Sequence, residues 1–348
     1  MGMGVLLKKI SPKLYNILIP KIRKYSVLHQ IRNDITISEK VCEDKEEIQY
    51  IVLNGHVGEA VRVMRALGEF RKFYSEDNIK PEFADGTLRN NKVIDKIIVI
   101  TTRRKAAVAR LWNNADEVIE LPEHEVMAIQ RYSEYTFGYK NILLPFRDFK
   151  NSYYFRLYGL SSMDIGWALQ IPPYKEKIIP CKYGEWTINQ GKKMIKKYGI
   201  KKNEAVILIP SALTCPNFPD VFWKKLISKF INKGKTVFVN CSTKQDQKIA
   251  DCGAITIDFP MDVFLYFCEY AGKVISNQSG LGDLVVWSGR NISCDMLIYD
   301  ETGNEMAHNY IMNYLGETVK KKQYNESTRY FAINDMDISD DRIYQEFL

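Results

Sequence analysis

The sequence predicts an α/β protein of two domains, each with a parallel β-sheet of the Rossmann type covered by helices. Three observations support this prediction. The chain has 348 residues, more than one ordinary hydrophobic core contains. Short apolar runs of strand length alternate with amphipathic segments of helical period. The alternation occurs twice, before and after a lysine-rich stretch at 192–202.

The first round of alternation begins with a buried strand that ends at Gly55-His56, followed by an amphipathic helix. The strands expected in this round cover 49–56, 96–102, 117–121 and 141–145. The helices expected between them cover 59–74, 104–113 and 124–134. The polar stretch 75–95 is expected to be a loop. Because helices alternate with apolar strands, the sheet should be parallel and covered on both faces.

The second round has the same pattern. Its expected strands cover 206–209, 236–240, 254–257, 273–275 and 292–299. Its expected helices cover 220–232, 261–270 and a segment that ends at Trp287. A last helix is expected near 340–348, crossing back onto the first domain.

These elements divide the chain into five parts. They are a basic N-terminal segment at 1–48, a first domain at 49–175, a connector at 176–203, a second domain at 204–330 and a C-terminal helix at 331–348. The two Rossmann-like domains are expected to face each other across a cleft, where open α/β sheets bind ligands.

Composition excludes several classes of protein. The chain is 46% hydrophobic and 26% charged, with a net charge of +7, which is typical of a globular protein. It lacks the concentrated basic face with interleaved aromatic residues that nucleic-acid binding requires. Its seven cysteines are scattered and never spaced as CxxC, which indicates reduced thiols in the cytoplasm.

The first 32 residues are basic, with seven Lys or Arg and no acidic residue. Apolar positions in this segment follow a helical spacing from Leu14 to Leu28. Two interpretations stay open. The segment lies on an anionic membrane surface, or its apolar positions pack on the protein's own surface.

The most informative stretch is 276–284, where an apolar run ends at small polar residues and an apolar-rich helix follows. A helix that begins there directs unpaired N–H groups and its positive dipole end at one point, which suits a phosphate. Ser279 and Thr214 hydroxyls, with the amides of Gly280 to Gly282, would hold a diphosphate. Asp283 would cap the helix or bind a sugar hydroxyl.

The first domain offers the turn 54–59, which contains His56 and Glu59. Either side chain can take a proton from an attacking hydroxyl, and the alternative is that His56 simply begins a helix. The turn lacks the third glycine of a dinucleotide fingerprint, and the chain has no Walker lysine loop and no GxSxG motif.

Metal binding is not expected. The chain has four histidines and no HxxxH pair. Asp335 and Asp337 form a DxD sequence near the C-terminus, where helix-capping acids are the better interpretation.

Three segments resemble the heptosyltransferases, which transfer ADP-heptose to the lipopolysaccharide core, and their GT-B relatives. Residues 55–67 (Gly-His-Val-Gly-Glu-Ala-Val-Arg-Val-Met-Arg-Ala-Leu) resemble that family's N-terminal Gly-Asp element. Residues 217–226 (Asn-Phe-Pro-Asp-Val-Phe-Trp-Lys-Lys-Leu) resemble its Trp-Pro-x-x-x-Trp-x-x-Leu helix start. Residues 279–284 (Ser-Gly-Leu-Gly-Asp-Leu) resemble its Thr-Gly-x-x-His-Leu turn.

The chain departs from the family pattern at four places. His56 stands where the family has its proposed catalytic Asp, Gln278 replaces an acidic residue, and Asp283 replaces the histidine of the turn. A lysine that meets the donor phosphates is replaced by Pro216 or Asn217. These differences indicate a divergent member with a donor other than ADP-heptose.

The resemblance implies a GT-B glycosyltransferase that inverts configuration and needs no metal or other cofactor. His56 would be the general base, and Glu59 would orient it or substitute for it. Donor-side residues implied by the resemblance and by the strand ends are Ser211, Thr214, Asn217, Cys241, Asp258, Phe259, Gln278, Ser279, Gly280, Leu281, Gly282 and Asp283. Acceptor-side residues are Asn54, Gly55 and Gly58.

The expected partners are a nucleotide-sugar donor and a glycan or glycolipid acceptor such as lipopolysaccharide or capsule. The expected location is the cytoplasm, or the inner face of the plasma membrane. Two other readings remain open: a nucleotide-sugar epimerase of similar fold, and a binding subunit of glycan assembly that has lost its activity.

Overall fold

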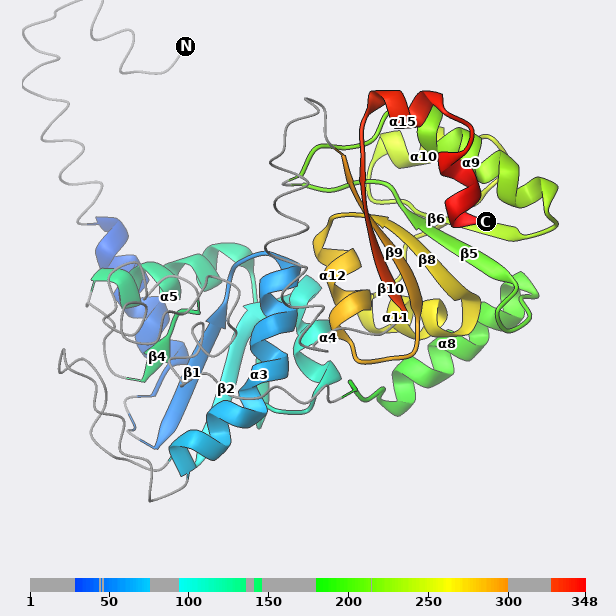
Figure 1. Ribbon diagram of the computed structural model, residues 1–348. Coiled ribbons are helices and arrows are strands. Elements are labelled where there is room, and N and C mark those ends of the chain that lie inside the picture. The colour runs from blue at the N-terminus through cyan, green and yellow to red at the C-terminus, as the bar shows by residue number, and fades with distance from the viewer. Residues whose placement is uncertain are drawn as a thin grey trace, which may run out of the picture.

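A computed structural model shows two parallel β-sheets side by side, with helices packed on and between them (Figure 1). The structure describes residues 29–43, 45, 47–75, 94–135, 141–145, 180–213, 215–299 and 327–348. Residues 1–28, most of the expected loop at 75–95, the end of the first domain and residue 214 lie outside the described residues.

The first sheet has the strand order β3-β2-β1-β4, and all its pairs are parallel. Its strands are β1 (Ile48–Leu53), β2 (Lys96–Thr102), β3 (Glu117–Leu121) and β4 (Ile142–Leu143). Its helices are α3 (Val57–Ser75), α4 (Arg103–Leu111) and α5 (Glu123–Tyr135). Because β1 is buried along its whole length, it is apolar at every position except Gln49 and does not alternate.

The second sheet has the order β10-β9-β8-β5-β6-β7, again all parallel. Its strands are β5 (Ala205–Ile209), β6 (Thr236–Asn240), β7 (Ile255–Ile257), β8 (Gly272–Asn277), β9 (Ser293–Tyr299) and β10 (Thr328–Ile333). Its helices are α8 (Glu185–Tyr198), α9 (Asp220–Asn232), α10 (Lys244–Ala250), α11 (Met261–Ala271) and α12 (Gly280–Trp287). The predicted pair of parallel α/β domains is therefore confirmed.

The two domains meet through α3 and α12, which lie between the sheets (Figure 1). One hydrophobic cluster contains side chains of both helices, including Val61 and Met64 from α3 and Leu284 and Trp287 from α12. Arg62 and Arg65 place their guanidinium groups 5.4 and 5.1 Å from the Trp287 ring centroid, where cation–π attraction adds to the contact. The domains are thus in direct apolar contact on this side.

The N-terminal border of the first domain lies earlier than expected. Residues 29–41 form a helix, and its Asp34 carboxylate is buried and accepts two hydrogen bonds from Arg131 of α5, both at 2.8 Å. Ile37 and Val41 pack against the core of the same sheet. The predicted border at residue 48 therefore leaves out a helix that packs on this domain.

The connector predicted at 176–203 consists largely of α8. Apolar Ile188, Ile195 and Tyr198 follow a helical spacing that the many lysines obscured. Gly191 lets α8 approach α11 closely, because a β-carbon there would lie 2.2 Å from the Tyr266 ring. The helix therefore belongs to the second domain.

The C-terminal segment corrects a prediction. It forms β10, a short helix α15 (Asp335–Ser339) and a 3₁₀ helix η2 (Ile343–Phe347), and not one helix. Tyr344 and Phe347 are fully buried against Phe222 and other residues of the second domain. The expectation that this segment crosses back onto the first domain is therefore wrong. Its aromatic side chains fill the outer face of the second sheet instead.

Candidate functional site

The candidate site lies where α3 and α12 both begin. A β-carbon built on Gly280 would lie 2.9 Å from Val57 Cβ and 3.1 Å from the amide nitrogen of Gly58. The first turns of the two helices are therefore in backbone contact across the domain junction. Because each helix begins with unpaired N–H groups and a positive dipole end, two such ends converge at this point.

Ser279 is the N-cap of α12. Its hydroxyl oxygen accepts a hydrogen bond from the Gly282 N–H at 3.1 Å. The Gly280 and Leu281 amides belong to the first turn, for which a helix supplies no carbonyl partner. A hydrogen-bonded cap and a half-buried first turn suit an anionic oxygen, and the diphosphate site at this turn stays a prediction.

Asp283 does not cap α12, which corrects one of the two expectations for this residue. Its carboxylate faces the first domain, where a β-carbon on Gly58 would lie 2.1 Å from Asp283 Oδ2. Burial raises the pKa of Asp283, and the positive charge of Arg62 opposes that increase in part. Asp283 is therefore a contact between the domains at the edge of the site.

Glu59 caps α3. Its Oε2 accepts a hydrogen bond from the backbone N–H of His56 at 2.8 Å, which is the backward half of a capping box. The expectation that Glu59 orients the imidazole is not met, because the carboxylate holds the backbone and not the ring. The His56 side chain is exposed, and among the described residues its ring has no hydrogen-bond partner.

A basic group borders His56 on the first domain. Arg103, Arg104 and Lys105 begin α4 at the carboxyl end of β2, next to the turn at the end of β1. Lys105 Nζ donates to the backbone carbonyl of Asn54 at 3.2 Å, and burial lowers the pKa of Lys105. In the described part of the chain these three side chains form no ion pair with a carboxylate at 4.0 Å or closer. Their charges are therefore available to a ligand.

The acceptor-side residues sit in the same turn. The Asn54 side-chain amide donates to Gln130 Oε1 and so ties the end of β1 to α5. Gly55 leaves room for the Glu59 carboxylate, which a β-carbon at that position would overlap. Gly58 leaves the corresponding room for Asp283.

On the second domain, Ser211 follows β5 and donates its hydroxyl to Asp246 Oδ1 at 2.5 Å. Asp246 is fully buried, and its other oxygen accepts the N–H groups of Ser242 and Thr243 at 2.9 and 2.8 Å. Because the Ser211 hydroxyl donates its proton to Asp246, Ser211 presents a lone pair to a ligand.

Asn217 holds the loop after β5 in shape. Its Oδ1 accepts from the Ala212 N–H at 2.7 Å and from the Asn277 side chain at 3.0 Å. Asn277 is fully buried at the end of β8 and also donates to the Pro210 and Pro216 carbonyls. The loop that carries Ser211 is thus fixed to the strand that leads into α12.

The other donor-side residues lie along the same carboxyl edge. Gln278 accepts a weak hydrogen bond from the Cys215 thiol at 3.7 Å. Cys241 and Asp258 follow β6 and β7, and burial, with the charges of Asp246 and Asp258, raises the pKa of the Cys241 thiol. Phe259 is half-buried and packs on Phe267, so it belongs to the core. Thr214 lies outside the described residues.

The DxD sequence near the C-terminus caps a helix, as predicted. Asn334 caps α15, and Asp337 Oδ2 accepts the Asn334 backbone N–H at 2.9 Å. Asp335 accepts the Tyr299 hydroxyl at 2.6 Å. Within the described ranges, no group of three or more His, Cys, Asp or Glu side chains is arranged to hold a metal ion.

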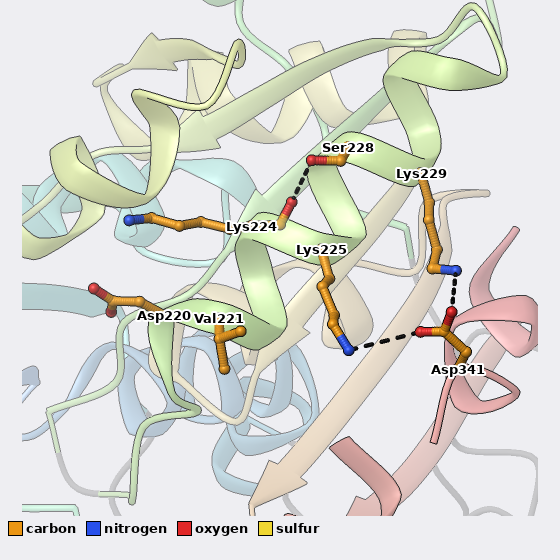
Figure 2. A pocket seen from close by; sticks show the side chains of 7 residues that line it. All are labelled: Asp220, Val221, Lys224, Lys225, Ser228, Lys229 and Asp341. Carbon is orange, nitrogen blue, oxygen red and sulfur yellow. Dashed lines mark hydrogen bonds and ion pairs between the residues drawn. The ribbon is translucent and has the colours of Figure 1, made fainter. Parts of the chain in front are cut away.

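A surface pocket on the outer side of α9 is unrelated to this edge (Figure 2). It is lined by Asp220, Val221, Lys224, Lys225, Ser228, Lys229 and Asp341. Lys225 and Lys229 form ion pairs with Asp341 at 3.6 and 3.5 Å, which fasten the C-terminal segment to α9. We therefore assign the pocket to packing of the C-terminus.

Sequence reasoning missed three residues that shape the site: Asn277, Asp246 and Lys105. The signal for Asn277 was a polar side chain at the end of an apolar strand. Asp246 was signalled by Thr243 three residues earlier, a spacing typical of a capping box. Lys105 was signalled by the run Arg103-Arg104-Lys105 directly after a buried strand.

Comparison with known sequences gives no match, either to a protein-family model or to a curated protein. Comparison of structures does. The ADP-heptose lipopolysaccharide heptosyltransferase II of E. coli matches with a TM-score of 0.52 at 12% identity, over 86% of this chain and 96% of that chain. A glycosyl transferase family 9 structure from Veillonella parvula DSM 2008 matches with a TM-score of 0.51 at 11% identity, over 85% and 88%.

At this level of identity the likeness concerns the path of the backbone. Together with the two parallel sheets, it confirms the fold that the motif resemblance implied. The chain therefore has a two-domain α/β fold like that of the heptosyltransferases.

Proposed function

We propose that this protein is a glycosyltransferase that moves a sugar from a nucleotide diphosphate donor to a hydroxyl of a cell-surface glycan. The second domain would bind the donor, and the first domain would bind the acceptor. Inversion of configuration and independence of metal are parts of the proposal. The likeness in fold to an ADP-heptose lipopolysaccharide heptosyltransferase supports the proposal as an analogy of fold, and the site must carry the rest.

One observation carries the proposal. The turn that bears His56 and the anion-suited start of α12 touch each other, with Gly280 against the Val57 and Gly58 backbone. A base on one domain and a diphosphate site on the other are thereby brought to the same point. Direct displacement at an anomeric carbon requires this juxtaposition.

In the proposed reaction His56 takes the proton of the acceptor hydroxyl while its oxygen attacks the anomeric carbon. The bond from that carbon to the diphosphate oxygen breaks on the opposite face, so the configuration inverts. The departing diphosphate carries the negative charge that develops. The Gly280 and Leu281 amides and the Ser279 hydroxyl would stabilise that charge with fixed dipoles.

The nucleoside would lie along the carboxyl edge of β5, β6 and β7. Ser211 supports this placement, since its proton is committed to Asp246 and its lone pair suits a hydroxyl or N–H donor of the ligand. Cys241 and Asp258 border the same edge. The phosphates would then point toward α12 and the first domain.

The acceptor would be acidic. Arg103, Arg104 and Lys105 form a cationic edge beside Asn54 and His56. Because these charges lack carboxylate partners among the described residues, they would attract a phosphate or carboxylate group of the acceptor. A lipopolysaccharide core or an acidic capsule meets this requirement.

A membrane-borne acceptor would place the protein at the inner face of the plasma membrane. The basic segment at 1–32 supports such a location. Among the residues that the structure describes, every helix is too short or too polar to traverse a bilayer. Deleting residues 1–28 should reduce sedimentation with anionic vesicles, and unchanged sedimentation would contradict this part of the proposal.

The test is release of nucleoside diphosphate from a panel of nucleotide sugars, with and without acidic glycan acceptors. His56→Ala should lower the release rate by about 10²–10⁴-fold, the usual contribution of a general base. His124→Ala is the matched control, because His124 is an exposed histidine at the start of α5 and should leave the rate unchanged.

Other outcomes point to the alternatives. Tight nucleotide binding without turnover for any donor would favour a binding subunit. Conversion of the donor sugar to its epimer without an acceptor would favour an epimerase. Equal rates for the His56→Ala variant and the unmodified protein would remove His56 from the mechanism.

A further inference from the structure

The outer side of α8 carries a concentrated positive charge. Lys192, Lys193, Lys196 and Lys197 are exposed on this helix, and Trp186 is 57% exposed at its beginning. We call these five residues the α8 lysine face. The only acidic residue in α8 is Glu185, at its first position.

Helix geometry places the five side chains on one side. Lys192 and Lys196 are four residues apart, as are Lys193 and Lys197, and Trp186 precedes Lys193 by two turns. The opposite side of α8 packs on α11, where Thr187 donates to Asp262 and Gly191 contacts Tyr266. The exposed lysine face therefore lies on the side of α8 opposite α11. Helix α8 itself runs along the outside of the second domain (Figure 1).

The four lysines have no ion pairs among the described residues. Lys197 packs over the Tyr198 ring, with its Nζ 4.9 Å from the centroid, and Lys201 beyond the helix pairs loosely with Glu204 at 4.0 Å. By contrast, Lys225 and Lys229 of α9 form ion pairs with Asp341 (Figure 2). Like charges spaced four residues apart destabilise a helix. In α9 the pairing with Asp341 offsets this repulsion, whereas in α8 no carboxylate among the described residues does so.

We infer that the α8 lysine face docks the second domain on an anionic phospholipid bilayer. Clusters of four or more lysines on one side of a helix bind acidic lipid surfaces, and each adds about fivefold to the affinity. An exposed tryptophan beside them suits the membrane interface, where indole rings concentrate. The inference stands apart from the proposed reaction, because vesicle binding is measured without a donor or an acceptor.

The experiment measures sedimentation of the full chain with vesicles of phosphatidylglycerol and phosphatidylcholine, and with phosphatidylcholine alone. The test variant replaces Lys192, Lys193, Lys196 and Lys197 by Gln. The control variant replaces Lys224, Lys233, Lys244 and Lys248 by Gln, which removes the same charge from the α9 and α10 side. Both variants keep residues 1–28, so the difference between them reports the α8 face alone.

The α8 variant should bind phosphatidylglycerol vesicles at least about tenfold more weakly than the control variant at low salt. The difference should vanish near 1 M salt, where screening shortens the reach of charges to about 3 Å. Trp186→Ala should weaken binding further with unchanged salt dependence. Circular dichroism confirms that each variant is folded.

Equal binding by the two variants would overturn the inference, since the overall positive charge of the protein would then explain the vesicle binding. Undiminished vesicle binding by the α8 variant, together with lost binding to a soluble acidic polysaccharide, would also overturn it. Release of nucleoside diphosphate in vesicle-free solution should be the same in both variants, whether or not the vesicle result holds.

Discussion

The amide nitrogen of Gly58 lies 3.1 Å from the position that a β-carbon on Gly280 would occupy. This relationship joins the first turn of α3 to the first turn of α12, and thereby one domain to the other. It also fixes how far the turn that bears His56 stands from the amides at the start of α12. The contact has room for glycine and for no larger residue, because Val57 Cβ and the backbone nitrogens of Val57 and Gly58 form its far side.

Gly280→Ala should therefore separate the two helices and lower the free energy of unfolding by about 1–3 kcal/mol, the usual cost of overpacking. The same change should lower the rate of nucleoside diphosphate release, since base and leaving group are no longer held together. Chemical denaturation and the donor assay measure the two effects.

The matched control is Gly68→Ala in the interior of α3. A β-carbon at Gly68 would meet Asn114 Oδ1 at 3.5 Å, an ordinary contact. Since alanine favours a helix over glycine by about 1 kcal/mol, this variant should be equally or more stable. A similar loss of stability in both variants would contradict the close contact between the helices.

Asp283→Asn should stabilise the protein at neutral pH. Burial raises the pKa of Asp283, so the folded state keeps the proton over a range in which the unfolded chain has lost it. Stability therefore falls as pH rises from about 4, where the unfolded carboxyl titrates, and stays reduced above the folded pKa. The gain from Asn should shrink to nothing below about pH 4.

Asp116→Asn should destabilise the protein at neutral pH, which is opposite to the effect of Asp283→Asn. Burial alone raises the pKa of Asp116, but hydrogen bonds from the Ile97 N–H and Arg71, with the nearby positive charges, outweigh burial and lower it. Its stabilisation is present above the unfolded pKa and is lost as pH falls through the folded pKa. Urea titrations from pH 3 to pH 8 measure the change in unfolding free energy that each variant causes. Changes of the same sign in both variants would refute the environments assigned to Asp283 and Asp116.

Ser279→Ala should cost about 1 kcal/mol of stability through loss of the α12 cap, and it should also weaken binding of nucleoside diphosphates. Asn334→Ala removes the cap of α15, away from the site, and should cost a similar free energy without any change in nucleotide affinity. Calorimetric titration with ADP, UDP, GDP and CDP separates the two effects. Unchanged affinity for every ligand in Ser279→Ala would argue against the diphosphate site.

Arg329→Ala should destabilise the second domain by about 1.5–3 kcal/mol, the value of hydrogen bonds to a charged group. Arg329 donates to both oxygens of the fully buried Asp295 at 2.7 and 2.8 Å, and Lys273 lies 3.2 Å from the same carboxylate. Arg329 and Lys273 also donate to the Glu346 and Phe347 carbonyls, so the C-terminus should loosen as well.

Arg342→Ala is the control for that variant. Arg342 lies in the same C-terminal segment and pairs with Asp340, but its side chain is 92% exposed. Exposed pairs contribute at most about 1 kcal/mol, so this change should have little effect. Thermal unfolding and hydrogen exchange at 343–348 distinguish the two variants, and comparable losses would contradict the role of buried Asp295.

Most strands and helices could be predicted because each has a local cause. Buried strands such as β5 are continuous apolar runs, and α9 shows a clear helical period that begins and ends as expected. Strand β10 was missed because it is an edge strand whose residues are mostly half-buried. In the sequence its Arg329 is typical of a loop, and only the structure shows that it binds the buried Asp295.

For the site, the sequence placed the candidate residues at the carboxyl edges of the sheets but could not show their hydrogen-bond partners. It could not show that Glu59 bonds the His56 backbone, because the same spacing serves a base and a cap. It could not show Ser211 on Asp246, which is 35 residues away.

The sequence by itself determined the alternation of strands and helices, the start of a helix near Ser279 and the run of lysines at 192–202. These follow from residues within a turn or two of each other. Only the tertiary structure decided that Gly58 faces Asp283, that Gly280 touches α3, and that the C-terminus packs on α9. Such contacts join segments far apart in the chain, and the packing of whole surfaces selects them, which no local pattern encodes.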